Sequence, residues 1–216
     1  NRYVITFTLI MTTVAALILA GLFFATKAQA EINEAVFNKR AVLRSVQSYL
    51  EVDVDDMSDE EVLSVFDAQV DQIVLNMKGE IVDTSFVVAA GYKGGRAENV
   101  DTAKEKKKPE ADRILPLYVF NTPGKEKLYI LSVRGNGLWD EIWGNVAVSW
   151  DKDTKGTVMG ASFDHKGETP GLGAEIKDNP SFSSQFKNKK LYKGTDYVSV
   201  KVAKGSARDK DYEVDG

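Results

Sequence analysis

The chain of 216 residues contains no cysteine and a single histidine. The absence of cysteine excludes disulfide bonds, thiolate metal sites and a thiol nucleophile, and one imidazole argues against a histidine-based zinc site. An excess of positive charge is also lacking, because 28 Lys and Arg stand against 32 Asp and Glu. Such a balance offers nucleic acid no long-range attraction. We therefore expect no metal site and no nucleic-acid partner, and any redox role requires an organic cofactor.

One long apolar run is present near the N-terminus. Tyr3 to Thr26 contains no charged residue, and at about 1.5 Å per residue it is long enough to cross a hydrocarbon core of about 30 Å. We interpret residues 1–30 as a transmembrane anchor that contacts the lipid bilayer. The alternative is a cleaved signal peptide, since Ala28-Gln29-Ala30 fits a small-x-small cleavage site. Length favours the anchor, because the apolar region of a signal peptide spans about 7 to 15 residues.

Helical patterns continue beyond the anchor. Residues 31–57 carry apolar side chains at helical spacing, which predicts a juxtamembrane helical stalk. Ser58-Asp59-Glu60-Glu61 has the pattern of a capping box and predicts a short helix through about Asp67. The apolar positions of the stalk are Ile32, Val36, Leu43, Val46 and Leu50.

Short β-branched or aromatic runs, separated by Gly, Pro, Asn or Asp, follow this helix. Their period of two predicts strands of an antiparallel sheet with helices at its margins. We therefore expect an α+β domain over residues 58–216. The predicted strands are 72–77, 80–83, 114–121, 127–133, 144–150, 157–163 and 197–202.

A charged segment interrupts the predicted strands. Lys93 to Arg113 holds twelve charged residues of both signs, including three consecutive lysines at 106–108. Because the opposite charges nearly cancel, a solvated loop is favoured over a binding patch. We predict an exposed charged insertion over 93–113.

Two glycine-rich blocks combine backbone freedom with polar groups. Residues 165–173 read His-Lys-Gly-Glu-Thr-Pro-Gly-Leu-Gly, and residues 134–139 read Arg-Gly-Asn-Gly-Leu-Trp. Glycine accepts positive φ and places no Cβ between backbone N–H groups and a flat or anionic ligand. Composition alone is equally typical of ordinary turns. The full strings favour loops that surround a bound cofactor.

The two blocks together resemble a known family. Glu168 to Gly173 resembles the signature of the membrane-anchored FMN-binding domains of bacterial redox-driven ion pumps. These domains occur in the C subunit of the Na+-translocating NADH:quinone reductase and in its relative, the G subunit of the Rnf complex. Gly135 to Trp139 resembles the Gly-Asn-Gly-Leu-Trp segment of the Na+-pump protein rather than its Rnf counterpart.

The last residues extend the resemblance. Residues 212–216 read Tyr-Glu-Val-Asp-Gly, and in this family Val-Asp-Gly precedes a Ser-Gly-Ala-Thr segment. The threonine of that segment carries FMN through a phosphoester bond. The resemblance therefore implies covalent FMN on a threonine just beyond Gly216, and no residue of 1–216 is the attachment point.

The resemblance also implies which residues contact FMN. Leu138, Trp139 and Leu172 would form apolar walls, Thr169 would face the polar edge of the ring, and Lys204 would stabilise an anionic flavin. Ordinary roles stay open: a core position for Trp139, a turn for Thr169 and a solvated Lys204. The predicted cofactor-binding set is Gly137, Leu138, Trp139, Glu168, Thr169, Gly171, Leu172, Gly173, Lys204, Val214, Asp215 and Gly216, and no residue is predicted to be catalytic.

Two polar residues of the second block have open roles. Glu168 could bond either to the ligand or to its own loop. His165 is a lone histidine without a visible partner, so we interpret it as structural, although Asp164 is placed to orient it.

The function implied by the resemblance is electron relay. The chain would be a single-pass component of a Na+-translocating NADH:quinone oxidoreductase in the bacterial inner membrane, with an extracytoplasmic FMN-binding domain and other membrane subunits as partners. Its apolar span has no charged residue, which is typical of an anchor rather than an ion path. Two alternatives stay open, the G subunit of an Rnf-type complex and a non-redox membrane-anchored binding or assembly domain. A serine hydrolase is disfavoured, because no Gly-x-Ser-x-Gly elbow occurs.

Overall fold

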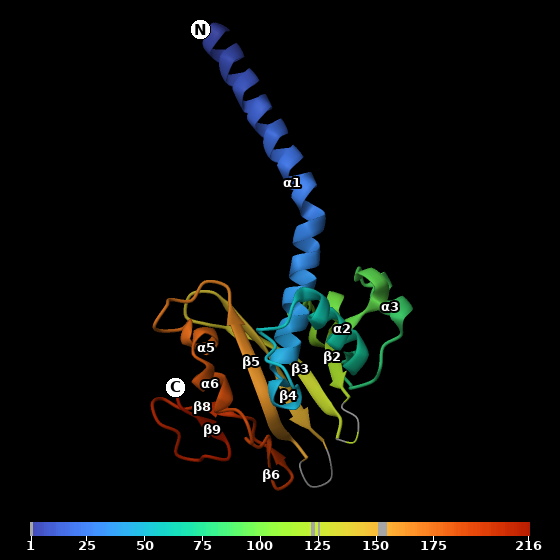
Figure 1. The fold of residues 1–216 in the computed structure, drawn as a ribbon, viewed down its shortest axis with the longest axis vertical. Helices are drawn as coiled ribbons and strands as arrows, with labels where there is room; N and C mark the ends of the chain where they lie inside the picture. Colours follow the sequence, from blue (N-terminus) through green and yellow to red (C-terminus); the bar gives the residue numbers. More distant parts are fainter. Residues whose placement is uncertain (1, 122–123, 125, 151–154) are drawn as a thin grey trace. The chain divides into compact units, whose positions relative to one another are not determined.

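The computed structural model describes residues 2–121, 124, 126–150 and 155–216. The chain divides into two compact units, Asn1–Phe37 and Asn38–Gly216. Helix α1 (Arg2–Arg44) provides the first unit and the opening residues of the second (Figure 1). The second unit starts at Asn38, within α1. The expected division into 1–30, 31–57 and 58–216 stays a prediction.

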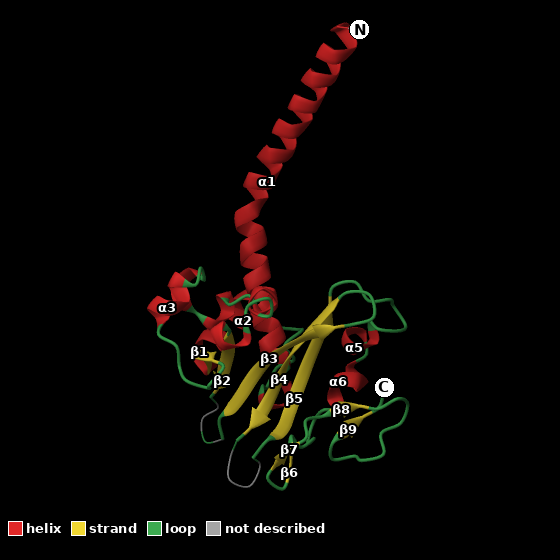
Figure 2. Cartoon of the chain, turned by 180° about the vertical axis from the view of Figure 1, so that it is seen from behind, coloured by secondary structure: helices red, strands yellow, loops and turns green. Residues whose placement is uncertain are grey.

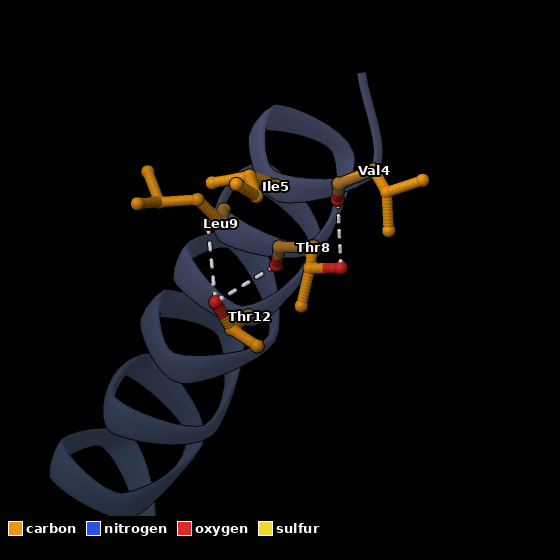
Figure 3. Close-up of a pocket in the computed structure, with 5 residues that line it drawn as sticks. All are labelled: Val4, Ile5, Thr8, Leu9 and Thr12. Atoms are coloured by element: carbon orange, nitrogen blue, oxygen red, sulfur yellow. Dashed lines mark hydrogen bonds between the residues drawn. The ribbon is translucent and has the colours of Figure 1, made fainter. Parts of the chain in front are cut away.

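The first unit exposes its side chains from residue 2 to residue 35. Within the described residues, α1 is the one helix that is long and apolar enough to cross a membrane, by length and composition. The hydroxyls of Thr8 and Thr12 donate to the carbonyls of Val4 and Thr8, each at 2.9 Å. The surface groove in Figure 3, lined by these residues with Ile5 and Leu9, therefore has its hydroxyl donors satisfied within the helix. These features are those of a membrane anchor.

The second unit is built on a five-stranded sheet in the order β1-β2-β3-β4-β5. Every neighbouring pair in this sheet is antiparallel, and helices flank the sheet (Figure 2). The expected α+β class is therefore confirmed. The strands are β1 (Val70–Asn76), β2 (Ile114–Phe120), β3 (Leu128–Asn136), β4 (Glu141–Ser149) and β5 (Thr157–His165).

One face of the sheet packs against helices that precede it in the chain. The capping box is confirmed, since Ser58 Oγ accepts from Glu61 N–H at 3.3 Å and the Glu61 carboxylate accepts from Ser58 N–H at 2.8 Å. It opens α2 (Asp59–Gln69), which ends beyond the predicted Asp67. Phe66 of α2 is fully buried, and its ring meets Tyr118 of β2 edge-on at 6.0 Å. Burial of such a side chain contributes about 3 kcal/mol.

The opposite face of β5 is covered by helices that follow it. The short helices α5 (Glu175–Asp178) and α6 (Pro180–Ser184) follow β5, and Phe163 of β5 lies 4.9 Å from Phe186, ring to ring. The neighbouring Ser162 points the other way and donates to the Ala41 carbonyl of α1 at 2.7 Å. Because successive side chains alternate between faces, both faces of β5 are covered.

The C-terminal segment is pinned by two short ladders. β6 (Tyr192–Lys193) pairs with β7 (Asp196–Tyr197), and β8 (Lys201–Val202) pairs with β9 (Glu213–Val214). Val214 is fully buried in a cluster with Val158 and Phe186. The last residues are therefore part of the packed domain.

Two predicted strands are wrong. Residues 80–83 make only the isolated bridge between Leu75 and Ile81, because Asp83 caps the helix α3 (Thr84–Ala89) that begins at once. The predicted strand 197–202 is divided between β7 and β8, because Ser199 adopts a φ of 61°, which an extended strand does not permit.

The predicted exposed insertion is also wrong in part. Residues 93–113 form short helical turns, and Ala97, Val100 and Glu105 are buried. Glu105 is 1% exposed and accepts from the Tyr92 hydroxyl and, at 3.0 Å, from the N–H of Ile114 at the start of β2. Tyr92 and Ile114 lie outside the charge run, and only Lys108, which pairs with Glu105 at 2.6 Å, lies inside it, so the run itself gave no sign of burial. The short helices of the second unit not yet named are η1 (Gln47–Tyr49), η2 (Lys93–Gly95), η3 (Ala97–Asn99), α4 (Thr102–Glu105) and η4 (Glu110–Asp112).

Candidate functional site

The two glycine-rich blocks meet at one end of the sheet. The first block closes the hairpin between β3 and β4, and the second leaves the end of β5. Ile142 of β4 pairs with His165 of β5, and Lys166 N–H donates to the Glu141 carbonyl at 3.0 Å. Antiparallel pairing thus brings together segments about 30 positions apart in the chain. Figure 1 shows both loops at the same end of β5.

Glu168 joins the two loops. Its Oε1 accepts from the backbone N–H groups of Trp139 at 3.0 Å and of Asp140 at 3.1 Å. The side chain is buried, with 6% of the residue exposed. A Cβ at Gly137 would lie well inside 3.0 Å of Glu168 Oε1, and a Cβ at Gly173 would lie equally close to Oε2. The Glu168 side chain therefore bonds to the backbone of the β3–β4 loop, and not to its own loop as one of the two open roles supposed.

Three large apolar side chains on these loops are exposed to solvent. Leu138 is 80% exposed, Trp139 71% and Leu172 68%. The alternative of a core position for Trp139 is therefore wrong. Trp143, in contrast, is partly buried beneath the Arg134 guanidinium, which lies 5.2 Å from its ring centroid. The loops thus present an uncovered apolar surface, which we call the apolar tips: Leu138, Trp139 and Leu172.

The second loop also presents backbone donors. The Thr169 carbonyl accepts from the N–H groups of Leu172 at 3.1 Å and Ala174 at 3.2 Å, and Gly171 has a φ of 73°. The turn that was left open as an ordinary role for Thr169 is thus present. Within the described residues, the backbone N–H groups of Thr169, Gly171 and Gly173 donate to no acceptor. These three groups are available to the polar edge of a ligand.

A shallow hollow of about 180 Å³ lies on the neighbouring part of the sheet. Sequence reasoning did not include this hollow, because its residues come from three strands and share no motif. The lining residues are Val133, Arg134, Gly135, Ile142, Trp143 and Phe163.

His165 forms a hydrogen bond with the backbone of the second loop. Its Nδ1 accepts from Glu168 N–H at 3.2 Å, and its buried Nε2 has no hydrogen-bond partner among the described residues. Asp164 does not orient the imidazole, because its carboxylate pairs with Lys177 at 2.8 Å and accepts from the His165 backbone N–H. His165 therefore has the structural contact expected of it, and the role suggested for Asp164 is wrong.

The C-terminal residues of the predicted set are held elsewhere. Asp215 N–H donates to Gln185 Oε1 at 2.7 Å, at the end of α6, and Gly216 N–H donates to the Gly205 carbonyl at 3.0 Å. Lys204 is exposed beside this segment. No hydrogen bond or ion pair within the described part of the chain joins this group of residues to the glycine-rich blocks. The sequence does not reveal Gln185, since a single amide in a short helix carries no signal.

The charged groups around the site are paired at its rim. Asp140 pairs with Lys166 at 3.3 Å, and Arg134 pairs with Glu141 at 2.8 Å. The backbone N–H of Glu141 and the Lys166 ammonium hold the pKa of the Asp140 carboxyl below its ordinary value. Within the described residues, no group of His, Asp and Glu is placed to hold a metal ion.

Comparisons with known proteins match most of this chain. A family model described as the FMN-binding domain matches residues 137–216. The C subunit of the Na+-translocating NADH-quinone reductase from Pseudomonas aeruginosa is 30% identical over 208 residues, which cover 92% of this chain and 76% of the relative. Its counterpart from Haemophilus ducreyi is 40% identical over 93 residues, which cover 43% of this chain and 35% of that relative.

Solved structures show the same fold. The crystal structure of the C subunit of the Na+-translocating NADH-quinone reductase from Parabacteroides distasonis matches with a TM-score of 0.70 and 32% identity, covering 88% of this chain and 83% of that one. The structure of NqrC from Shewanella oneidensis matches with a TM-score of 0.60 at 22% identity and covers 82% of each chain. The second likeness shows the fold alone.

Proposed function

This chain belongs to the family formed by the C subunit of the Na+-translocating NADH-quinone reductase, and from that premise we propose that it relays electrons within such a complex. It carries one FMN, attached through a phosphoester to a threonine just beyond Gly216. The observation that supports this function is the apolar surface of Leu138, Trp139 and Leu172, which are 68 to 80% exposed and lie within the matched FMN-binding region. The protein has no turnover by itself.

The residues on the two loops fit a flavin. A flat ring laid on the apolar tips removes apolar surface from water, which stabilises the bound state by about 25 cal/mol per Å². The unpaired N–H groups of Thr169, Gly171 and Gly173 match the carbonyl and nitrogen acceptors at the edge of such a ring. Gly171 places no side chain between these donors and the ligand, and nothing lies within 4 Å of its Cβ position.

FMN supplies a ring that accepts and releases electrons, and this chain's residues bind and orient it. Leu138, Trp139 and Leu172 exclude water from the ring faces. Lys204 precedes Gly205, whose carbonyl holds Gly216 N–H at 3.0 Å. A cation thus lies beside the segment that leads to the attachment residue, where it favours the negative charge of the phosphate or of the reduced flavin.

The setting that we propose is the bacterial inner membrane. Helix α1 anchors the chain, the domain lies on the periplasmic side, and the partners are other membrane subunits of the same pump. A single introduced cysteine tests the side, because the chain has none of its own. Lys107→Cys, at an exposed position, reacts with a membrane-impermeant maleimide in intact spheroplasts if the domain is periplasmic. Labelling only after lysis contradicts this orientation.

Flavin fluorescence on a denaturing gel tests covalent FMN. The full-length protein, isolated from its own membranes, gives a fluorescent band at the mass of the polypeptide under ultraviolet light. Replacement of the first threonine beyond Gly216 by valine removes that fluorescence and leaves the folded domain intact. A dark band from the unaltered protein contradicts covalent attachment, and a domain that also releases no FMN on denaturation favours the non-redox alternative.

A further inference from the structure

We infer that Glu168 is a positioning residue that sets the separation of the apolar tips, and that Gly137 and Gly173 are glycines because they form the two sockets for its carboxylate. This inference rests on the proposed function for its consequence at the flavin. It assigns Glu168 to the protein's own backbone rather than to the cofactor. It also gives two of the glycines a reason other than contact with a ligand.

The first step is the hydrogen bonding of the carboxylate. Oε1 accepts from two successive backbone N–H groups, those of Trp139 and Asp140. Within the described residues, Glu168 makes no ion pair with a basic side chain, and it is buried. The buried carboxylate of Glu168 therefore depends on these two hydrogen bonds for its polar contacts. A shift of the β3–β4 hairpin by one bond length would break both of them.

The second step is the space around the carboxylate. The Cβ positions of Gly137 and Gly173 overlap Oε1 and Oε2 respectively, and neither glycine has positive φ. Alanine therefore fits the backbone conformation at both positions and is excluded only by neighbouring side chains, of which Glu168 is the nearest. Gly171 is the opposite case, with a φ of 73° and an open Cβ position.

The third step is the consequence for the tips. Trp139 is bonded to Glu168 through its own N–H, and Leu138 precedes it. Leu172 lies next to the Gly173 socket on the other loop. The carboxylate therefore touches both loops at the bases of the tips, and it fixes the gap that a flat ring enters. The backbone of Glu168 is held as well, because its N–H donates to His165 Nδ1 at 3.2 Å.

Two conservative variants separate position from charge. In Glu168→Gln the amide oxygen still reaches Trp139 and Asp140, so their N–H groups keep their protection from hydrogen exchange. In Glu168→Asp the charge stays but the side chain is one methylene shorter, and exchange at both N–H groups rises about tenfold or more. The measurement is hydrogen–deuterium exchange on the full-length protein in detergent. Loss of protection in the Gln variant with retention in the Asp variant overturns the inference.

A size exchange tests the sockets. Gly137→Ala alone lowers Tm by about 5 °C, because the methyl group overlaps the carboxylate. In the Glu168→Ala background the same substitution costs little, because the space is empty. Gly173→Ala behaves in the same way. Gly171→Ala is the matched control: its cost comes from backbone strain, so it is equal with and without Glu168. Costs at 137 and 173 that are also equal in the two backgrounds overturn the inference.

The flavin supplies a readout that a purely structural role leaves unchanged. The visible circular dichroism of bound FMN is retained in Glu168→Gln and altered in Glu168→Asp, at equal FMN content per polypeptide. An unaltered spectrum in Glu168→Asp contradicts the positioning role. The exchange and size experiments need no FMN, so their failure leaves the proposed function standing. If the gel band is not fluorescent but the Gly→Ala substitutions behave as expected, the role of Glu168 and the two glycines is supported and only covalent FMN is contradicted.

Discussion

The buried carboxylate of Glu105 allows a quantitative prediction about stability. Glu105 is 1% exposed and receives hydrogen bonds from the Tyr92 hydroxyl and Ile114 N–H, with Lys108 paired at 2.6 Å. Tyr92→Phe removes one hydrogen bond to a charged group and lowers the free energy of unfolding by about 2 kcal/mol. Glu105→Ala leaves the Tyr92 hydroxyl and Ile114 N–H without an acceptor beside a cavity, and costs about 4 kcal/mol.

The same contact predicts a pH dependence. Burial by itself raises the pKa of Glu105, but the hydrogen bonds from Lys108, Tyr92 and Ile114 outweigh it and hold the pKa below its ordinary value of 4.5. A carboxyl whose pKa is lowered by folding stabilises the protein above its unfolded pKa and loses this contribution as the pH falls through the folded value. The stability advantage of the wild type over Glu105→Gln is therefore full at pH 7 and shrinks below about pH 4.5.

Tryptophan fluorescence during urea unfolding is the appropriate assay, because Trp139, Trp143 and Trp150 all lie in the second unit. The full-length protein is kept in detergent throughout. Lys107→Ala, at an exposed neighbouring position, is the control and changes the free energy of unfolding by less than about 0.5 kcal/mol. If Tyr92→Phe is no more destabilising than this control, or if the advantage over Glu105→Gln does not depend on pH, the reasoning about this buried group is refuted.

Three further substitutions are measured by the same unfolding assay. Ser58→Ala removes the N-cap of α2 and costs about 1 kcal/mol, and a loss near zero contradicts the capping box. Val214→Ala empties a fully buried site beside Phe186 and costs about 2 kcal/mol; a cost near zero means that the C-terminal segment is not packed. Gly95→Ala forces a side chain onto a φ of 63° against Thr84 and costs about 2 kcal/mol; a neutral result argues against this turn.

The fold was predictable where its causes are local. The capping box at Ser58 and the strands from Ile114 to His165 depend on residue types that are adjacent in the chain, and the structure contains them. The strand predicted over residues 80–83 is wrong, although its residues suit a strand. Asp83 caps a helix that begins at the next residue, before a strand ladder can form. The burial of Glu105 was hidden for a different reason. Tyr92 and Ile114, which donate hydrogen bonds to Glu105 as Lys108 does, lie outside the charge run that suggested exposure.

The site divides in the same way. The resemblance identified both glycine-rich blocks, because their composition is unusual in itself. It did not reveal that Glu168 would bond to Trp139 and Asp140, since that contact joins positions 28 and 29 residues apart. It also did not include the hollow on the sheet, which combines Gly135 of β3 and Trp143 of β4 with Phe163 of β5. Contacts of this kind depend on the register between strands, which a single sequence does not state.

By itself, the sequence determined the apolar anchor, the α+β class and the family, because these follow from length, periodicity and short strings of neighbouring residues. Only the tertiary structure decided that Trp139 is exposed, that Glu168 faces backbone and that Gly137 and Gly173 leave room for it. The physical reason is that burial and close approach are properties of pairs of residues, and the pairs that matter here are brought together by the antiparallel pairing of β3, β4 and β5.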